Sequence, residues 1–327
     1  MYDNYKHKIL VLYGGNSFER EVSIMTAKKV LSIIDKKIYN VIDMEISNDK
    51  NISCREKKWI YDIIDINPDL VFIALHGSIG ENGAIQGLLE CLNIPYIGSN
   101  IMTSSICMNK FITKSIMRYN YIPVTDDIIL YKNKSYKIYI DEILRIGFPL
   151  IVKPNNGGSS IGVSVVNNKN ELIKAINYII DILNDDVIIE KFIYGKEITC
   201  VVYENNDNLN IASIMDIETE SKFYNYNEKY ESEKSFIDIS SLPNYMQDMI
   251  KKIAKKVFNI FNAKDYACID MIISEEQIYV IEINTLPGMT EKSLLTNSFE
   301  SISDLNSEIK NFSEFINTII KNNLSKV

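Results

Sequence analysis

The sequence predicts an α/β protein built from two or three domains. Its 327 residues exceed what one compact core usually needs. Near the start, the apolar run KILVLY (8–13) is followed by two glycines and an amphipathic stretch at about 21–31, and strand, glycine turn and helix open a doubly wound parallel-sheet domain. Further on, residues 148–166 read as strand, polar loop and strand of a second α/β unit, and residues 266–284 as a β-hairpin.

The hairpin carries three oxygen-bearing side chains that suggest a metal site. Glu282 and Asn284 are two residues apart in the second strand and therefore point to the same face. Asp270 in the first strand lies opposite Glu282 only if the turn has an odd number of residues, such as three; a two-residue turn puts it opposite Ile281. Two carboxylates and an amide oxygen suit Mg²⁺. Solvated surface acids are the alternative, but the apolar neighbours of Glu282 and the NTLPGMT loop that follows favour the metal.

Composition and charge narrow the class of protein. Apolar residues make up 46% and charged residues 24%, as in an ordinary globular protein. The net charge of −8 argues against broad contact with nucleic acid or an anionic membrane. No apolar run approaches the roughly 18 residues of a membrane span, and the first 15 residues lack the apolar core of a signal peptide. Five cysteines without CxxC spacing suggest reduced thiols in the cytoplasm.

In the first domain, two polar residues stand where ligands usually bind. Glu19 lies just ahead of the first helix, where an acid either complements the helix dipole or holds a substrate ammonium. The surrounding GGNSFEREVS is not a dinucleotide-binding fingerprint. His76 ends the strand PDLVFIALHG (68–77), and the carboxyl end of such a strand is a typical site position. The segment NIPYIGSN closes this domain at about residue 100.

The second unit contains a candidate phosphate loop. In IVKPNNGGSS the backbone N–H groups can cradle phosphate oxygens, and Lys153 adds positive charge. The loop differs from a Walker A motif, which leads into a helix and ends in GK[ST]. An ordinary turn is the alternative. Lys110 lies on the preceding helical segment, where a lone lysine is normally solvated.

Residues 185–203 form a strand, a short link and a second strand, with Glu190 and Glu197 flanking the link. An extended link of this kind can offer main-chain groups to an adenine edge and a carboxylate to ribose hydroxyls; solvated surface charge is the alternative. The polar segment 220–236 has neither helical nor strand periodicity and suits a long functional loop.

Together these motifs resemble the ATP-grasp ligases, and within them the D-alanine–D-alanine ligase family. The resemblance covers nearly the whole chain through collinear segments: GGNSFEREVS, ALHGSIGENGAIQG, IPYIGSN, MNKFITK, IVKPNNGGSSIGV, IEKFIYGKEIT, FYNYNEKY and IEINTLPGMTEKSL. It implies a three-domain ATP-grasp fold, with an N-terminal substrate-binding domain (1–100), a central subdomain with the phosphate loop (101–185) and a C-terminal subdomain with the metal site and substrate loop (186–327). It also implies a cytoplasmic homodimer.

The resemblance implies the following chemistry. ATP phosphorylates the carboxylate of one D-alanine, and the amine of a second D-alanine attacks the acylphosphate, giving the dipeptide used for peptidoglycan. Two Mg²⁺ ions, with Mn²⁺ as an alternative, neutralise the phosphates. Loop closure over the site keeps water from hydrolysing the acylphosphate.

The site residues implied by position fall into four groups. The ATP-binding residues are Lys110, Lys153, Ser159, Ser160, Glu190, Lys191, Ile193, Glu197 and Phe223. The metal ligands are Asp270, Glu282 and Asn284. The catalytic residues are Glu19, Ser159, Tyr230, Gly288 and Ser293, among which hydrogen bonds of Glu19, Ser159 and Tyr230 close the loops. The substrate-binding residues are Val22, His76, Lys229 and Leu294.

The chain departs from the family pattern at one important position. Where the family has an arginine before the Ile-Asp of the metal strand, this sequence has Cys268, which cannot supply a guanidinium's charge and forked donors. Ser78 and Asn82 are smaller departures. Three interpretations follow: an active ligase with an amine acceptor, as the Lys229-Tyr230 pair suggests; a ligase for another amino acid; or a nucleotide-binding paralogue with regulatory function and impaired activity.

Overall fold

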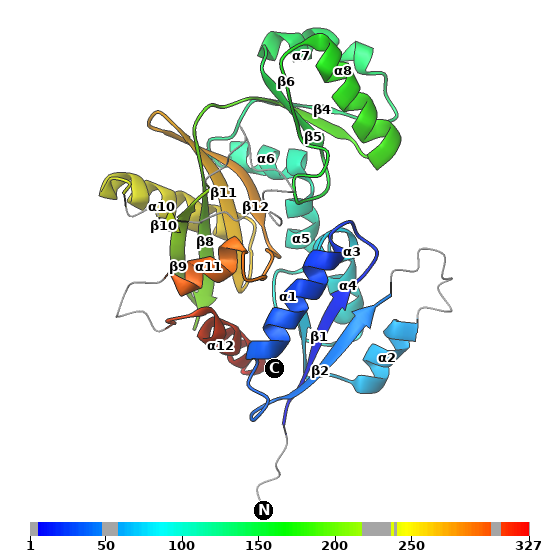
Figure 1. Ribbon diagram of the computed structural model, residues 1–327, viewed down its shortest axis with the longest axis vertical. Helices are drawn as coiled ribbons and strands as arrows, with labels where there is room; N and C mark the ends of the chain where they lie inside the picture. Colours follow the sequence, from blue (N-terminus) through cyan, green and yellow to red (C-terminus); the bar gives the residue numbers. More distant parts are fainter. Residues whose placement is uncertain (1–5, 48–57, 218–236, 239–240, 302–308, 327) are drawn as a thin grey trace, which may run out of the picture.

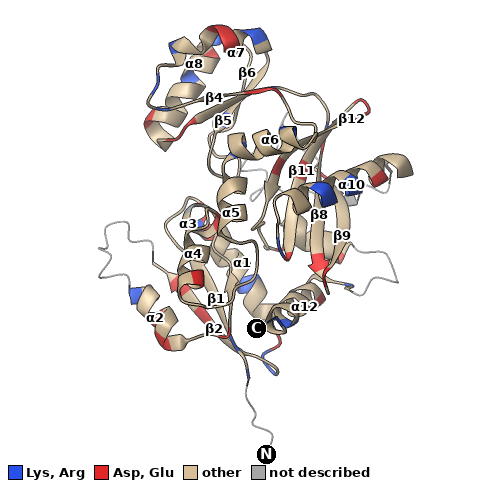
Figure 2. Ribbon diagram, turned by 180° about the vertical axis from the view of Figure 1, so that it is seen from behind, with Lys and Arg blue, Asp and Glu red and all other residues tan. Residues whose placement is uncertain are grey.

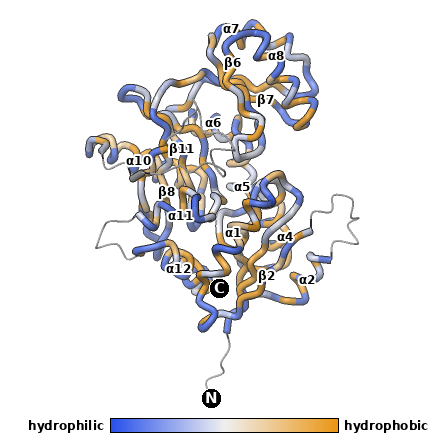
Figure 3. Tube along the Cα trace, in the orientation of Figure 1, coloured by the Kyte–Doolittle hydropathy of each residue, from blue (hydrophilic) through white to orange (hydrophobic). Residues whose placement is uncertain are grey.

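The computed structural model describes residues 6–47, 58–217, 237–238, 241–301 and 309–326. These residues form an elongated molecule in which three β-sheets, each with its own helices, lie around a central region (Figure 1). Apolar residues concentrate on the strands and on the inner sides of the helices (Figure 3). Phe223, Lys229 and Tyr230 lie outside the described residues. Within the described part of the chain, no helix has the length and apolar character needed to cross a bilayer.

The N-terminal sheet is parallel and has helices on both faces, which confirms the doubly wound arrangement. In β1, Ile9 and Val11 belong to one buried core and Leu10 and Leu12 to the other. Such two-sided burial explains why its strands are almost continuously apolar. The strands, in the order β2-β1-β3, are β1 (Lys8–Gly14), β2 (Asn40–Ile46) and β3 (Leu70–Ile73). The helices are α1 (Arg20–Ile33) and α12 (Phe312–Leu324) on one face, and α2 (Lys58–Ile66) and α4 (Ala84–Cys91) on the other, with α3 (Ser78–Glu81) preceding α4.

The second sheet is antiparallel and has the strand order β4-β7-β5-β6. Its apolar face packs against helices α7 and α8, which lie at the top of Figure 1. Asn168 caps α8 by accepting from the backbone N–H groups of the first turn. The elements are β4 (Asp127–Leu130), η2 (Tyr136–Ile138), α7 (Ile140–Ile146), β5 (Leu150–Pro154), β6 (Ser164–Val166), α8 (Lys169–Tyr178), the π-helical η3 (Ile179–Leu183) and β7 (Val187–Lys191).

The third sheet, in the order β10-β9-β8-β11-β12, is antiparallel and buried on both faces. Side chains of β8 alternate between two cores: Cys200 and Val202 contact the core under α10, whereas Val201 and Tyr203 contact the core shared with α12. Its strands are β8 (Lys196–Asn205), β9 (Asn208–Asp216), β10 (Ile237–Asp238), β11 (Tyr266–Ser274) and β12 (Gln277–Asn284). Its helices include α5 (Ile101–Met108), α6 (Lys110–Tyr119), α10 (Asn244–Ile260) and α11 (Leu294–Glu300).

The β11–β12 hairpin has the expected pairing for an unexpected reason. Ser274 faces Gln277, so the turn contains only two residues, and the prediction of an odd turn is wrong. Asp270 nevertheless faces Glu282, because Met271 faces Val280 and the register shifts between the two pairs. Ile281 is the extra residue of this β-bulge, which restores the pairing that a regular two-residue hairpin would have lost.

The predicted division of the chain at residues 100 and 185 stays a prediction, and several segments pack across it. Helix α12, far from the N-terminal sheet in sequence, fills one of that sheet's two cores. Strand β7 belongs to the second sheet although it follows residue 185. Cys107 and Met117, from α5 and α6, contribute to the core under α10.

We expect Phe315→Ala to destabilise the protein by about 4 kcal/mol, because truncating a buried phenylalanine leaves a cavity. Phe315 is fully buried and stacks on Phe299 with ring centroids 4.0 Å apart. Urea unfolding of Phe315→Ala, of the control variant Tyr119→Ala and of the wild type measures the change in the free energy of unfolding. Tyr119→Ala is the control: this ring is 86% exposed, and its loss should change the free energy of unfolding by no more than about 0.5 kcal/mol. Equal losses in both variants would contradict the central role given to α12.

Candidate active site

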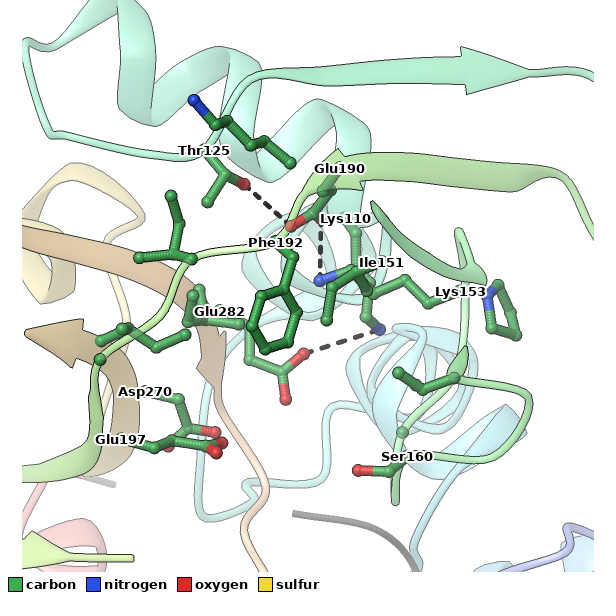
Figure 4. A pocket seen from close by; sticks show the side chains of 18 of the residues that line it. Lys110, Thr125, Ile151, Lys153, Ser160, Glu190, Phe192, Glu197, Asp270 and Glu282 are labelled. Carbon is green, nitrogen blue, oxygen red and sulfur yellow. Dashed lines mark hydrogen bonds and ion pairs between the residues drawn. The ribbon is translucent and has the colours of Figure 1, made fainter. Parts of the chain in front are cut away.

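Two adjoining cavities lie where the sheets meet. The larger, about 330 Å³, is formed between the second and third sheets (Figure 4). The smaller, about 90 Å³, is bounded by the N-terminal sheet and the loop after β12. Asp270 and Glu282 line both cavities. A group bound at this carboxylate pair would therefore touch a ligand in either cavity.

Apolar side chains form the walls of the larger cavity, as a flat aromatic base requires. They are Ile151, Ile161, Val163, Phe192, Ile193, Tyr194, Ile272 and Ile281. The link after β7 is held close to β11 because Gly195 has no side chain: a Cβ there would lie 2.3 Å from the carbonyl oxygen of Ile273. Neither main-chain polar group of Ile193 bonds to another described residue, so both can face the edge of a base.

A cluster of buried charges closes one end of the larger cavity. The Glu190 carboxylate lies 2.8 Å from Lys153 Nζ and 3.0 Å from Lys114 Nζ, and it accepts a hydrogen bond of 2.9 Å from the Thr125 hydroxyl. Lys114 also pairs with Asp127 at 3.4 Å. The side chains of Glu190 and the two lysines are at least nine-tenths buried.

The pKa values in this cluster follow from burial and charge. Burial alone would raise the pKa of Glu190, but Lys114 and Lys153 outweigh it and hold the pKa at about 2. For Lys114 burial dominates and lowers the pKa in spite of Glu190. For Lys153 burial acts in the same direction, but the carboxylates of Glu190 and Glu282 outweigh it and raise the pKa. The cluster therefore keeps Glu190 ionised at neutral pH.

The loop between β5 and β6 lies over both cavities. Lys110 Nζ donates to the Gly157 carbonyl at 2.5 Å and lies 3.7 Å from Glu282 Oε2, so this lysine links the loop to the carboxylate pair. Ser160 lines the larger cavity and Ser159 the smaller one. The Ser159 hydroxyl donates to the Glu19 carboxylate, which connects the loop to the N-terminal domain.

Asp270, Glu282 and Asn284 present oxygen atoms suited to a hard divalent cation. Thr199, fully buried on the neighbouring strand, donates to Asp270 Oδ1 at 2.5 Å, and Asn284 Oδ1 accepts from the backbone of Leu286 at 3.0 Å. These contacts fix the orientation of two of the three predicted metal ligands. In the described part of the chain, no three His, Cys, Asp or Glu side chains are grouped so that they could hold a metal ion. Nucleotide phosphates and water would have to complete the coordination.

Glu19 is held by the backbone around it and faces the smaller cavity. Glu19 is the N-cap residue of α1, and its side chain makes no capping bond to the helix. A Cβ at Gly77, where φ is +63°, would lie 2.4 Å from Glu19 Oε2, so only glycine leaves room for the carboxylate. Both interpretations offered by the sequence, an acid that complements the helix dipole and a ligand for a substrate ammonium, stay predictions.

His76 is buried beside Glu19 and is connected to the substrate loop. Its Nε2 lies 3.0 Å from the Thr26 hydroxyl, which also accepts from the backbone N–H of Met289 at 3.1 Å. Its Nδ1 lies 3.6 Å from Glu81. Thr26 thus joins His76 to the loop that carries Gly288, so the first-domain wall of the cavity and the loop keep a defined spacing.

The described candidate residues gather around the two cavities, with one exception. The larger cavity contains Lys110, Lys153, Ser160, Glu190, Lys191, Ile193 and Glu197. The smaller contains Glu19, His76, Ser159, Asn284, Gly288, Ser293 and Leu294. Val22 is buried in α1 and is not a lining residue; its Cγ1 lies 3.7 Å from where a Gly288 Cβ would be. The functional roles assigned to all of these candidate residues stay predictions.

Sequence reasoning missed several residues of the site. Lys114 is the most important of these, and its spacing of four residues from Lys110 on one helix was a usable signal. Thr199 could have been found from its place two residues after Glu197 in the same strand. The others are Thr26, Glu81, Thr125, Phe192 and Tyr194.

Comparison with known proteins identifies relatives over nearly the whole chain. Family models described as D-ala D-ala ligase C-terminus and N-terminus match residues 113–319, and 8–66 with 54–99, respectively. D-alanine–D-alanine ligase A of Bacillus cereus is 38% identical over 292 residues, covering 89% of this chain and 92% of that protein.

Solved structures also match nearly the whole chain. D-alanine–D-alanine ligase of Bacillus anthracis complexed with ATP has a TM-score of 0.80 at 34% identity, covering 98% of each chain. VanG D-Ala:D-Ser ligase of Enterococcus faecalis has a TM-score of 0.79 at 26% identity, covering 98% of this chain and 100% of that one.

We expect Lys114→Met to lower the free energy of unfolding by about 3 kcal/mol at pH 7, the low end for breaking a buried ion pair. Glu190 and Asp127 lose their shared cation, but Glu190 keeps Lys153 and Asp127 keeps Arg118. The pH dependence has a definite sign. Because its partners depress the folded pKa of Glu190, this stabilisation is complete above the unfolded pKa of about 4.3 and is lost as the pH falls towards about 2. The difference between variant and wild type should therefore shrink on acidification.

Urea unfolding at pH 7, 4 and 3 measures this difference across the window in which it should shrink. The exposed Lys252→Met is the control and should match the wild type throughout. A Lys114→Met deficit that grows as the pH falls would contradict the assignment of Lys114 to Glu190.

We expect Thr199→Val to weaken divalent-metal binding about tenfold, because Asp270 loses the hydroxyl that orients it. Thr199→Ser keeps the hydroxyl and should bind as the wild type does. Electron paramagnetic resonance titration of Mn²⁺ in the presence of ADP measures the affinity without turnover. Wild-type Mn²⁺ affinity in a folded Thr199→Val protein would show that Asp270 needs no such support.

Proposed function

Because this chain belongs to the D-alanine–D-alanine ligase family, we propose that it uses ATP to join two D-alanine molecules into the dipeptide required for peptidoglycan synthesis. The observation that carries the proposal is the carboxylate pair Asp270–Glu282, which borders both cavities. A ligase needs this arrangement, because the γ-phosphate of ATP in one cavity must reach the carboxylate of an amino acid bound in the adjoining cavity.

ATP occupies the larger cavity. The adenine lies between the apolar walls and meets the main chain at Lys191–Ile193, and Glu197 binds ribose hydroxyls. The phosphates lie under the β5–β6 loop, near Lys110, Lys153 and Ser160. Glu190 contributes by holding Lys153 in place, since the two side chains are 2.8 Å apart. Phe223 and Lys229 complete this part of the site by family resemblance alone.

Asp270, Glu282 and Asn284 would hold two Mg²⁺ ions, for which Mn²⁺ could substitute. When bound, these ions neutralise phosphate charge and polarise the transferred group. The protein groups around them have separate tasks. Thr199 orients Asp270, and Lys110 balances the charge of Glu282 at 3.7 Å. Lys110 also keeps the loop over the phosphates through Gly157.

The two D-alanines occupy the smaller cavity. Glu19 binds the ammonium of the first, beside His76, and the first carboxylate faces the γ-phosphate. A carboxylate oxygen forms the bond to phosphorus as ADP leaves. The neutral amine of the second D-alanine, held near Gly288 and Ser293, then attacks the acyl carbon and forms the C–N bond. The bond from the acyl carbon to the phosphate oxygen breaks, and the phosphate leaves with the proton that the amine nitrogen gives up. Tyr230 joins Glu19 and Ser159 in closing the site against water, by family resemblance.

The protein acts in the cytoplasm as a homodimer, with small molecules as its substrates. Lys and Arg are interspersed with Asp and Glu along the elements drawn in Figure 2, and the net charge of −8 does not favour nucleic acid as a partner. An amine acceptor is favoured over D-lactate by the Lys229-Tyr230 pair. D-Serine is the informative competitor, because a structural relative is a D-Ala:D-Ser ligase.

The test is simultaneous measurement of phosphate and dipeptide with ATP, Mg²⁺ and either D-alanine, D-serine or D-lactate as second substrate. We expect D-alanyl-D-alanine as the main product, and we expect Glu282→Ala to lower its rate a hundredfold or more at every Mg²⁺ concentration, as loss of preorganised charge stabilisation typically does. Glu276→Ala, in the exposed turn of the same hairpin, should be unaffected.

Two results would contradict this proposal. The first is near-normal activity in folded Glu282→Ala. The second is D-lactate competing with D-alanine on equal terms at neutral pH.

A further inference from the structure

The smaller cavity has an unusual balance of charge. Its described lining includes four acidic side chains, and Lys292 is the one lysine or arginine among them. The acids are Glu19, Glu81, Asp270 and Glu282. Two of them are assigned to metal and one to a substrate ammonium, so they do not attract a carboxylate. An amino acid that enters this cavity nevertheless brings a carboxylate with it.

The lysines nearby are committed to other partners. Lys110 contacts Glu282 and the Gly157 carbonyl, and Lys153 pairs with Glu190, both in the larger cavity. Lys29 pairs with Glu291 at 3.7 Å and does not line the smaller cavity. Lys292 makes no ion pair with any other residue that the structure describes, and its side chain is exposed on the loop after β12. Its ammonium is therefore available to a ligand.

Strand β11, which also borders the cavity, supplies no compensating charge at Cys268. This residue is 4% exposed and faces Asn284 across the β11–β12 pair. A thiol has neither the fixed charge nor the forked donors of a guanidinium. Among the lining residues that the structure describes, Lys292 is therefore the lysine or arginine that can meet a substrate carboxylate.

We propose that Lys292 binds the carboxylate of the acceptor amino acid and thereby selects acceptors that carry one. This rests on the proposed function and adds a specificity-determining residue to it. Lys292 adjoins Ser293 and follows Gly288 by four residues, in the loop assigned to the acceptor. The acceptor carboxylate stays ionised throughout the reaction, whereas the donor carboxylate is consumed at the phosphates. An ammonium with three rotatable donors suits such a target, because it tolerates small differences in acceptor position.

The test compares D-alanine with D-alaninamide as acceptors. The amide has no carboxylate, so it can accept but cannot be phosphorylated. The measured quantity is the ratio of kcat/KM for the two acceptors, from the yields of D-alanyl-D-alanine and D-alanyl-D-alaninamide with ATP and D-alanine. In the wild type this ratio should strongly favour D-alanine. In Lys292→Ala it should fall about tenfold or more, the usual effect of losing a charged hydrogen bond, while KM for the donor D-alanine stays unchanged.

Two further variants sharpen the comparison. Lys29→Ala removes a neighbouring cation that lies outside the cavity and should keep the wild-type ratio. Adding Cys268→Arg to Lys292→Ala places a cation on strand β11 at the same cavity and should restore part of the preference for D-alanine. Circular dichroism verifies that each variant is folded.

The outcomes are distinguishable. If Lys292→Ala makes dipeptide with the wild-type ratio, the role of Lys292 is refuted and the proposed function stands. If Lys29→Ala lowers the ratio as much, the ratio depends on the overall positive charge near the cavity and not on Lys292, and the assignment to Lys292 is also refuted. If the wild type makes no dipeptide from any amino acid, the proposed function fails and this inference fails with it.

Discussion

The pairing of β11 with β12 places Asp270 opposite Glu282, and the rest of the site is arranged around these two carboxylates. Like charges on adjacent strands repel each other, so the pairing is favourable only when cations lie close by. Lys110, at 3.7 Å from Glu282, supplies one charge, and the proposed Mg²⁺ ions supply the others. The β-bulge at Ile281 is what brings the two carboxylates onto one face.

The second support of the site is the buried charge cluster around Glu190. Two lysines and two carboxylates share an interior where each alone would be strongly destabilising, and their mutual contacts make the arrangement tolerable. Such a cluster is a poor source of stability compared with a packed apolar core. Its value lies in geometry, because Lys114, Lys153 and Thr125 together fix the Glu190 carboxylate at the end of the larger cavity. The loop beside it is anchored at its start by Asn155 and Asn156, and the contacts of Lys110 and Ser159 connect it to the two cavities.

Much of this architecture could be predicted from local patterns. Strand, glycine turn and helix indicated the doubly wound sheet, and the spacing of Glu282 and Asn284 indicated a shared face. The bulge could not be predicted, because nothing in IYVIEIN marks Ile281 as an extra residue. Lys114 was missed because a helical lysine is usually solvated; its burial depends on Asp127 and Glu190, which are distant in sequence. The packing of α12 could not be predicted either, because its contacts are also with residues distant in sequence. Tyr230 and its loop lie outside the described residues.

The position of α12 has a consequence for the order of events during synthesis. Strand β1 leaves the ribosome early, but one face of its sheet is covered in part by Phe312 and Phe315, from one of the last helices of the chain. Domains generally fold as units as they emerge, N-terminal first. Here the part of this apolar face that α1 does not cover stays exposed until about 300 further residues have been translated. The N-terminal unit therefore completes this core only when the chain is nearly finished, and until then the exposed apolar surface favours aggregation.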